Sequence, residues 1–353
     1  FIKNLDRCCE RNTEALLFIK RKYYMIISRT PFRVSFVGGG TDLRSFYSKE
    51  PGQVLSTSID KYIYIVVKRQ MGIVEYKYRV NWSKVEFRNR IEDIEHPIVR
   101  EALKIMNIDF PIEITTFADI PAGTGLGSSS AFAVGLVHAL YALKGQLTTK
   151  YTLAEVAADI EVEKLKRVMG KQDHYASSYG DLNVFTFNAD ETVKVEPVFY
   201  SSDVHHKLEK NLLLFYTKQK RDASKVLQVQ NQQAAQNMDV LIKMKNLVNP
   251  MRDALSTGKN LNQVGEILHE NWKLKRSLTD IISSNEIDLY YEKARKAGAI
   301  GGKLLGAGGG GFLMFYVEAD KQQKVINALS GLFHFQVGLD SSGTRITYYD
   351  QTV

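Results

Sequence analysis

Residues 121–130 read PAGTGLGSSS, in which glycines at every second position run into three consecutive serines. Glycine lets the backbone adopt positive φ angles and lets another molecule approach its amides closely. We predict that Ser128, Ser129 and Ser130 cap a helix that continues through apolar residues to Leu140. A glycine loop before a helix N-terminus attracts anions, because unpaired N–H groups and the helix dipole both favour negative charge. The stretch therefore predicts a phosphate-binding loop.

A tight turn with a serine cap is the alternative, and the spacing alone does not exclude it. No Gly-Lys-Ser/Thr follows, so the stretch is not a Walker loop. It is not the dinucleotide-binding fingerprint either, since Ser128 stands where the third glycine belongs.

Two further segments share its character. Residues 29–42 read RTPFRVSFVGGGTD, a strand pattern that ends in three glycines, and residues 303–311 read KLLGAGGGG. Ordering so many glycines costs conformational entropy, and a plain turn does not need that many glycines. We expect backbone that lies close to a ligand or to another loop.

The composition describes a globular protein with two domains. The chain has 353 residues, 44% hydrophobic and 24% charged, and no apolar run approaches the roughly 18 residues that cross a bilayer. Its net charge of +8 favours anionic partners, but no basic block or aromatic-basic motif points to nucleic acid. The adjacent Cys8 and Cys9 do not suit a structural disulfide and favour a reducing, cytoplasmic setting.

The pattern of strands and helices favours an α+β fold. Residues 62–67 and 73–80 predict a hairpin, and residues 222–248 predict one long helix that Pro250 ends. Helices and strands do not alternate regularly. We divide the chain into a basic extension at 1–24 without a catalytic role, a domain at 25–200 and a domain at 201–353. The catalytic chain is expected to begin near Met25.

The three glycine segments, in this order and spacing, resemble the signature motifs of the GHMP kinases, the superfamily of galactokinase, homoserine kinase and mevalonate kinase. The resemblance covers the chain after Met25. It implies an N-terminal mixed α/β nucleotide-binding domain, a C-terminal ferredoxin-like domain, and ATP and Mg²⁺ as cofactors. It implies that the triphosphate is held by Pro121, Gly123, Gly125, Leu126, Gly127, Ser128, Ser129 and Ser130.

The resemblance also implies the catalytic residues. Ser129, or its neighbour Ser128, and Glu161 are expected to bind Mg²⁺, and Asp173 is expected to act as the base. Arg33 lies in the first motif, where a cation beside Asp173 would stabilise charge on the transferred group. His174 departs from the pattern, because galactokinases have Gln there. The plainer alternatives are a helix-end carboxylate for Asp173 and a strand-end salt bridge for Arg33.

Within the superfamily, the sequence looks like the D-glycero-D-manno-heptose 7-phosphate kinases, which phosphorylate the anomeric hydroxyl to give a 1,7-bisphosphate for nucleotide-activated heptose and surface glycans. Gly39 and Gly40 replace the Glu-His with which galactokinases engage a free hexose. The implied substrate contacts are Gly39, Gly40, Thr41, Asp42, Gly308, Gly309 and Gly310. For the substrate's own phosphate, Lys273, Arg276 and Arg221 are candidates, although all three also suit solvated helix faces.

Two alternatives stay open: a kinase for a free sugar such as fucose, and a sensor that binds ATP and sugar without turnover. The presence of Asp173, Glu161, Ser129 and Arg33 together argues against the sensor. The expected partners are ATP and a small sugar phosphate, with no nucleic acid and no membrane. A homodimer is compatible with this reading.

Overall fold

The structure is a computed structural model that describes residues 25–219 and 223–350. The predictions on residues 1–24, with their two cysteines, and on Arg221 lie outside the described residues.

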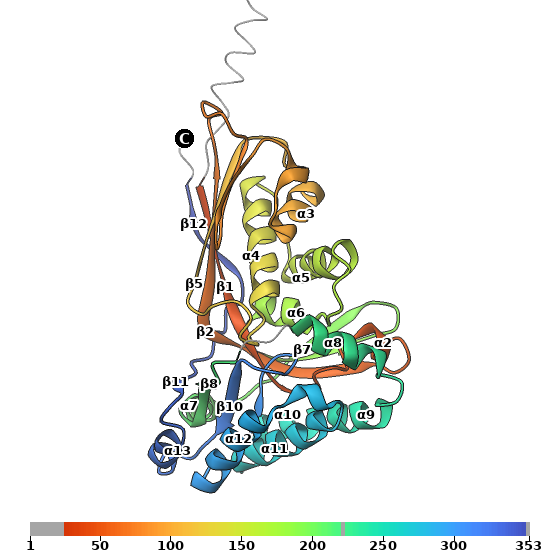
Figure 1. The fold of residues 1–353 in the computed structure, drawn as a ribbon, viewed down its shortest axis with the longest axis vertical. Coiled ribbons are helices and arrows are strands. Elements are labelled where there is room, and N and C mark those ends of the chain that lie inside the picture. The colour runs from red at the N-terminus through yellow and green to blue at the C-terminus, as the bar shows by residue number, and fades with distance from the viewer. Residues whose placement is uncertain (1–24, 220–222, 351–353) are drawn as a thin grey trace, which may run out of the picture.

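The larger of two sheets has eight strands and forms the upper part of the molecule (Figure 1). Its main path runs in the order β12-β1-β2-β5-β3-β4, and β6 and β7 extend from the first half of β2. β1 and β2 are antiparallel neighbours over most of their length. The strands are β1 (Met25–Val37), β2 (Gly52–Arg69), β3 (Tyr78–Asn81), β4 (Val85–Arg88), β5 (Ile112–Ala118), β6 (Leu182–Phe187), β7 (Val193–Pro197) and β12 (Arg345–Tyr349).

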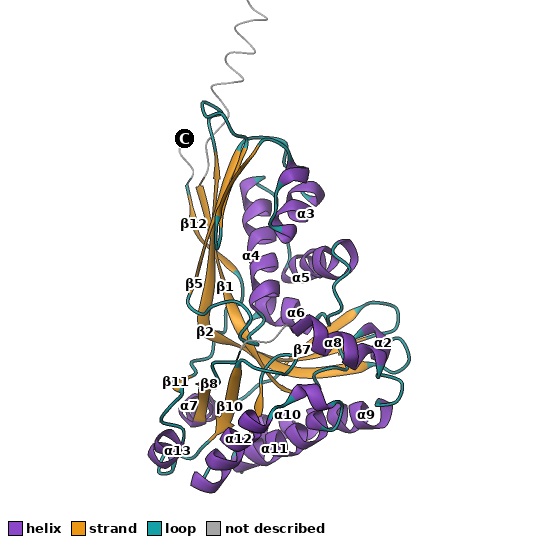
Figure 2. Cartoon of the chain, viewed as in Figure 1, coloured by secondary structure: helices purple, strands orange, loops and turns teal. Residues whose placement is uncertain are grey.

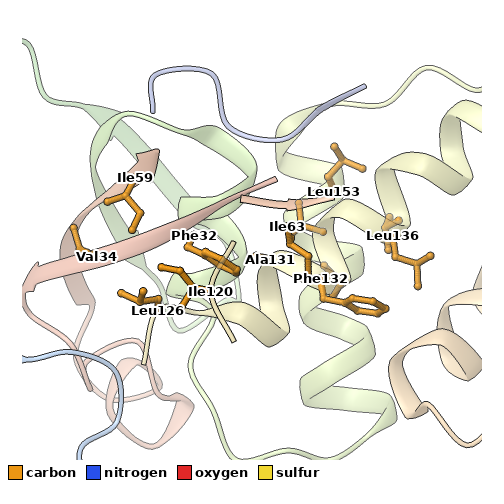
Figure 3. Packing of buried hydrophobic residues seen from close by; sticks show 14 of the residues in the cluster. Phe32, Val34, Ile59, Ile63, Ile120, Leu126, Ala131, Phe132, Leu136 and Leu153 are labelled. Atoms are coloured by element: carbon orange, nitrogen blue, oxygen red, sulfur yellow. The ribbon is translucent and has the colours of Figure 1, made fainter. Parts of the chain in front are cut away.

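Helices cover one face of this sheet, and α4 (Ser128–Leu143) packs directly on β1 and β2 (Figures 1 and 2). α4 comes close because Gly135 has no side chain: a Cβ there would lie 2.7 Å from Thr30 Oγ1. Figure 3 shows Phe32 of β1 and Phe132 of α4 among the buried side chains between the layers. The other helices of this half of the molecule are α2 (Arg44–Tyr47), η1 (Ile91–Asp93), α3 (Pro97–Ile105), α5 (Lys150–Ala158), η2 (Asp159–Lys164) and α6 (Gln172–Tyr179).

The second sheet is antiparallel, in the order β11-β8-β10-β9, and has helices packed against it in the lower part of Figure 1. Its strands are β8 (Leu212–Tyr216), β9 (Gly301–Leu304), β10 (Phe312–Tyr316) and β11 (Phe333–Gln336). The helices of this half are α7 (Ser202–Asn211), α8 (Ala223–Gln232), α9 (Met238–Asn246), α10 (Val248–Thr257), α11 (Asn262–Arg276), η3 (Asp280–Ile282), α12 (Asn285–Ala297) and α13 (Gln322–Ala328).

The predicted hairpin of 62–67 and 73–80 is wrong. β2 pairs with β5 instead, and β3 runs parallel to β5. Residues 70–77 form no strand, and Gly72 turns the chain with a φ of +78°. The alternating apolar residues indicated a strand but carried no information on its partner.

The predicted long helix at 222–248 is also wrong, because α8 ends at Gln232 and α9 begins at Met238. Pro250 does not end a helix. It lies in the first turn of α10, where a missing N–H costs no helical hydrogen bond.

The last strand, β12, returns to the first sheet and pairs antiparallel with β1. The mixed sheets and helices confirm the predicted α+β fold class, while the exact division at residue 200 stays a prediction. None of the helices in the described part of the chain combines the length and apolar character needed to span a membrane.

Candidate active site

The loop at 121–130 turns through three left-handed glycines. Gly123, Gly125 and Gly127 have φ angles of +79°, +85° and +75°. Gly127, not a serine, is the N-cap residue, and no side chain caps α4. The predicted serine cap is therefore wrong: Ser128, Ser129 and Ser130 form the first turn, where backbone N–H groups lack helical partners.

The three glycine segments come together. The backbone N–H of Arg33 donates to the Leu126 carbonyl at 3.1 Å, which attaches β1 to the loop. On the other side, a Cβ at Gly306 would lie 2.6 Å from Gly125 Cα, too close for any side chain. The expectation of glycine backbone that lies close to another loop is confirmed by these contacts.

Arg33 and Asp173 form the centre of the site. Arg33 Nε donates to Asp173 Oδ1 and Nη2 donates to Oδ2, both at 2.6 Å, so the pair is bidentate. The remaining nitrogen, Nη1, donates to the Gly125 carbonyl at 2.8 Å. Arg33 is buried. This geometry fixes the orientation of the carboxylate directly beside the glycine loop.

Two cavities meet at this ion pair. The acceptor cavity, as we call it, is lined by Ser35, Gly39, Gly40, Asp42, Gln172, Lys275, Lys303, Arg33 and Asp173, among others. The loop cavity follows the glycine loop and is lined by Gly123, Gly125, Gly127, Ser128, Ser129, Ser130, Arg33 and Asp173, with residues of the third segment. Arg33 and Asp173 belong to both, so a group in one cavity can reach a group in the other.

Asp42 lies on the wall of the acceptor cavity. Its Oδ1 accepts from the Gly40 N–H at 2.9 Å and its Oδ2 from the Gln172 N–H at 3.3 Å. Burial, and secondarily the charge of Asp173, raises the pKa of Asp42. A carboxylate oriented in this way is suited to accept hydrogen bonds from a ligand's hydroxyls.

Other predicted substrate contacts lie elsewhere. Thr41 is buried and its hydroxyl contacts the backbone of Gly38 and Gln53, which holds the loop in shape. Gly308 and Gly310 line the loop cavity instead of the acceptor cavity, and the Gly309 N–H donates to the Ile282 carbonyl.

A third, more apolar cavity adjoins Ser128 and Ser129. Its walls include Trp82, His96 and Phe132, whose rings contact one another with centroids 4.7 to 4.8 Å apart. Burial lowers the pKa of His96 to about 4, so its ring is neutral at physiological pH. Such a cavity, beside the start of α4, suits a flat aromatic group.

Ser129 and Glu161 also meet. Ser129 Oγ donates to Glu161 Oε1, and Arg167 Nη1 lies 2.8 Å from the Ser129 oxygen and 2.5 Å from Oε1. His174 Nε2 lies 2.9 Å from the other oxygen of Glu161. Burial alone would raise the pKa of Glu161, but these partners outweigh it and hold the pKa at about 2.

Comparison with known proteins gives a concordant result. Residues 97–181 match the GHMP kinases N terminal domain and residues 251–334 match the GHMP kinases C terminal. The chain belongs to the GHMP kinases. Membership implies ATP as the phosphoryl donor.

Several relatives cover most of this GHMP kinase. The D-glycero-alpha-D-manno-heptose 7-phosphate kinase of Campylobacter jejuni is 29% identical over 86% of this chain and 93% of its own. The bifunctional fucokinase/GDP-fucose pyrophosphorylase of Arabidopsis thaliana is 28% identical over 87% of this chain and 31% of its own. A solved D-glycero-D-manno-heptose 1-phosphate kinase from Bacteroides thetaiotaomicron shares the fold, with a TM-score of 0.76 at 22% identity over 92% of this chain and all of that one.

The sequence reading missed two basic residues of the kinase's acceptor cavity. Of the charged run on α11, Lys273 is exposed and pairs with Glu270, and Arg276 pairs with Asp288 at 2.7 Å. Lys275 lies on the buried side and reaches the cavity, as does Lys303 of β9. Each step along a helix turns the side chain by about 100°. The apolar neighbours Leu268 and Trp272 mark the buried face, which could have identified Lys275.

Proposed function

We propose that this kinase transfers the γ-phosphoryl group of ATP to the anomeric hydroxyl of D-glycero-D-manno-heptose 7-phosphate. The product is the 1,7-bisphosphate, on the route to nucleotide-activated heptose for surface glycans. The observation that carries the proposal is the meeting of the acceptor and loop cavities at Arg33 and Asp173. The sugar-phosphate substrate is supported by the relative from Campylobacter jejuni.

The proposed chemistry follows from the ion pair. The Asp173 carboxylate accepts the proton of the acceptor hydroxyl, whose oxygen forms a bond to the γ-phosphorus as the bond to the ADP oxygen breaks. Arg33 orients the carboxylate through the bidentate pair and places positive charge beside the group in transfer. The amides of the glycine loop and of Ser128, Ser129 and Ser130 hold the phosphates, with Pro121 and Leu126 shaping the loop. The adenine occupies the cavity of Trp82 and His96.

Ser129 and Glu161 fit the Mg²⁺ that the family implies. Both offer oxygen, the carboxylate is ionised, and Mg²⁺ at phosphate sites takes only one or two protein ligands. When bound, the ion neutralises charge on the phosphates. Arg167 donates to Ser129 Oγ and to Glu161 Oε1 in this structure, and it would have to give up these contacts for the ion to bind there.

The free-sugar alternative has an observation of its own, the similarity to the fucokinase-containing plant enzyme. A coupled ADP-release assay on heptose 7-phosphate, free heptose, fucose and galactose separates the two. We expect kcat/KM for heptose 7-phosphate to exceed the others by at least about 100-fold. Equal or faster turnover of fucose would replace the proposed substrate. A cytoplasmic location and a homodimer stay predictions.

A further inference from the structure

Lys275 and Lys303 are buried lysines of the acceptor cavity that have no carboxylate partner, and burial lowers the pKa of both. Their side chains are almost entirely inaccessible, yet both line the cavity. Within residues 25–219 and 223–350, neither lysine forms an ion pair. Buried charges in proteins are normally paired, because removing an ammonium group from water is costly. Two neighbouring buried lysines without a counter-charge therefore need an explanation.

Their hydrogen bonds are incomplete as well. An ammonium group has three donors. Lys275 Nζ donates to the carbonyls of Gly306 at 2.5 Å and Leu304 at 3.4 Å, and Lys303 Nζ donates only to the Phe36 carbonyl at 3.0 Å. Each lysine thus keeps at least one N–H without a protein acceptor, on side chains that line the cavity.

Nearby polar atoms are also unsatisfied. Ser35 Oγ and Gln172 Oε1 are buried, line the acceptor cavity and have no hydrogen-bond partner among the described residues. Both residues face Gly39, since a Cβ there would lie 3.7 Å from Ser35 Oγ and 3.6 Å from Gln172 Nε2. The cavity therefore presents cations and hydroxyl-binding groups to one ligand.

The two lysines face the acceptor cavity and not the proposed ATP site. Neither lysine lines the loop cavity, where the triphosphate is proposed to lie. Asp42, on the wall of the acceptor cavity, acts electrostatically on both lysines.

We propose that Lys275 and Lys303 form an anion subsite that binds the phosphate already present on the acceptor sugar. This rests on the proposed function, and it makes the phosphate monoester a requirement for tight binding. The dianion supplies the counter-charge and hydrogen-bond acceptors that the protein does not. A free sugar brings no negative charge that would favour the protonated form of the two lysines, and it leaves their N–H groups without an acceptor, so it binds weakly.

The test measures binding without ATP, by titration calorimetry with heptose 7-phosphate and with free heptose. For the unaltered protein we expect the phosphate to improve Kd at least 100-fold. The ratio of Kd for free heptose to Kd for heptose 7-phosphate should fall at least tenfold in Lys303→Met and in Lys275→Met. Kd for ATP should stay within about twofold in both variants. Lys273→Met, on the exposed side of α11, is the matched control and should leave the ratio unchanged.

Thermal unfolding separates this role from a purely structural one. Removing an unpaired buried charge should keep or raise Tm in both Met variants, and inorganic phosphate at constant ionic strength should raise Tm of the unaltered protein more than theirs. Unchanged Kd ratios in both variants would overturn the subsite while leaving the kinase assignment intact. A different outcome is also informative: the unaltered enzyme could release ADP with a free sugar, while the Met variants still lose the tighter binding of the sugar phosphate. That result would overturn the proposed substrate and keep the subsite.

Discussion

At the scale of single residues, the site depends on side chains whose partners are fixed by geometry. Asp173 is the clearest case, because Arg33 donates to both of its oxygens. The resemblance to the GHMP kinases pointed to Arg33, Asp173, Glu161 and Ser129, and the structure brings them into two contacting pairs. It did not indicate Lys275 or Lys303, because burial of a lysine depends on tertiary packing that a charged run conceals.

Asp173→Asn should reduce kcat at least 100-fold, because an amide cannot take the proton of the attacking hydroxyl. ATP affinity should stay within about threefold, since the glycine loop is untouched. Single-turnover kinetics and a nucleotide-binding titration measure the two quantities. Retention of more than about a tenth of kcat, a barrier change under about 1.4 kcal/mol, would exclude Asp173 as the base.

Gly39→Ala should narrow the acceptor cavity without distorting the backbone. Gly39 lacks the positive φ of Gly38 and Gly40, and a Cβ there meets only ordinary contacts near Gln172 and Ser35. We expect KM for the sugar to rise about tenfold or more, with Tm and KM for ATP unchanged. A KM for the sugar that does not move would mean that the acceptor does not pass Gly39.

At the scale of elements, the site is assembled by loops that touch across the sequence. The first segment follows β1, the second precedes α4 and the third joins β9 to β10. Their glycine content predicted backbone close to a ligand or to another loop, but it did not say which loop. Only the structure shows Gly306 against Gly125. Strand pairing could not be predicted from the sequence either, because the register of a strand depends on residues distant in the chain. The wrongly predicted strand at 73–80 is the example.

Gly306→Ala should raise KM for ATP at least tenfold, because its Cβ would displace Gly125 and the loop around the phosphates. Gly145→Ala is the control: Gly145 also has a positive φ, +65°, but a Cβ there meets nothing within 4 Å. Gly145→Ala therefore introduces the backbone strain of a positive φ without a close contact between loops. Equal effects of the two changes on KM for ATP would show that strain, not the contact between loops, is responsible.

At the scale of the whole molecule, stability and pH are linked through the acceptor cavity. Burial, and secondarily Arg33, lowers the pKa of Lys275 from 10.5 to about 8. Between these values the unfolded chain binds the proton and the folded chain has released it, so the free energy of unfolding rises with pH. The buried Lys275 therefore lowers the free energy of unfolding by its full amount below pH 8, and this effect disappears towards pH 10.5.

The stability difference between Lys275→Met and the unaltered protein should therefore shrink as pH rises from about 8 to 10.5, by roughly 3 kcal/mol at most. Denaturant titrations at several pH values measure it. Over the same pH range, kcat/KM for the sugar phosphate should fall as the ammonium is lost. A stability difference independent of pH would contradict the shifted pKa.

The pairing of β12 with β1 has a mechanical consequence. The Asp350 N–H donates to the Met25 carbonyl at 3.0 Å, so the described chain opens and closes at one point of one antiparallel ladder. A force applied through residues 25 and 350 loads that ladder in an unzipping geometry, in which its hydrogen bonds break one after another and not together. Optical tweezers should record β12 peeling away at low force before either sheet yields, with β1 still attached to β2 by its much longer ladder.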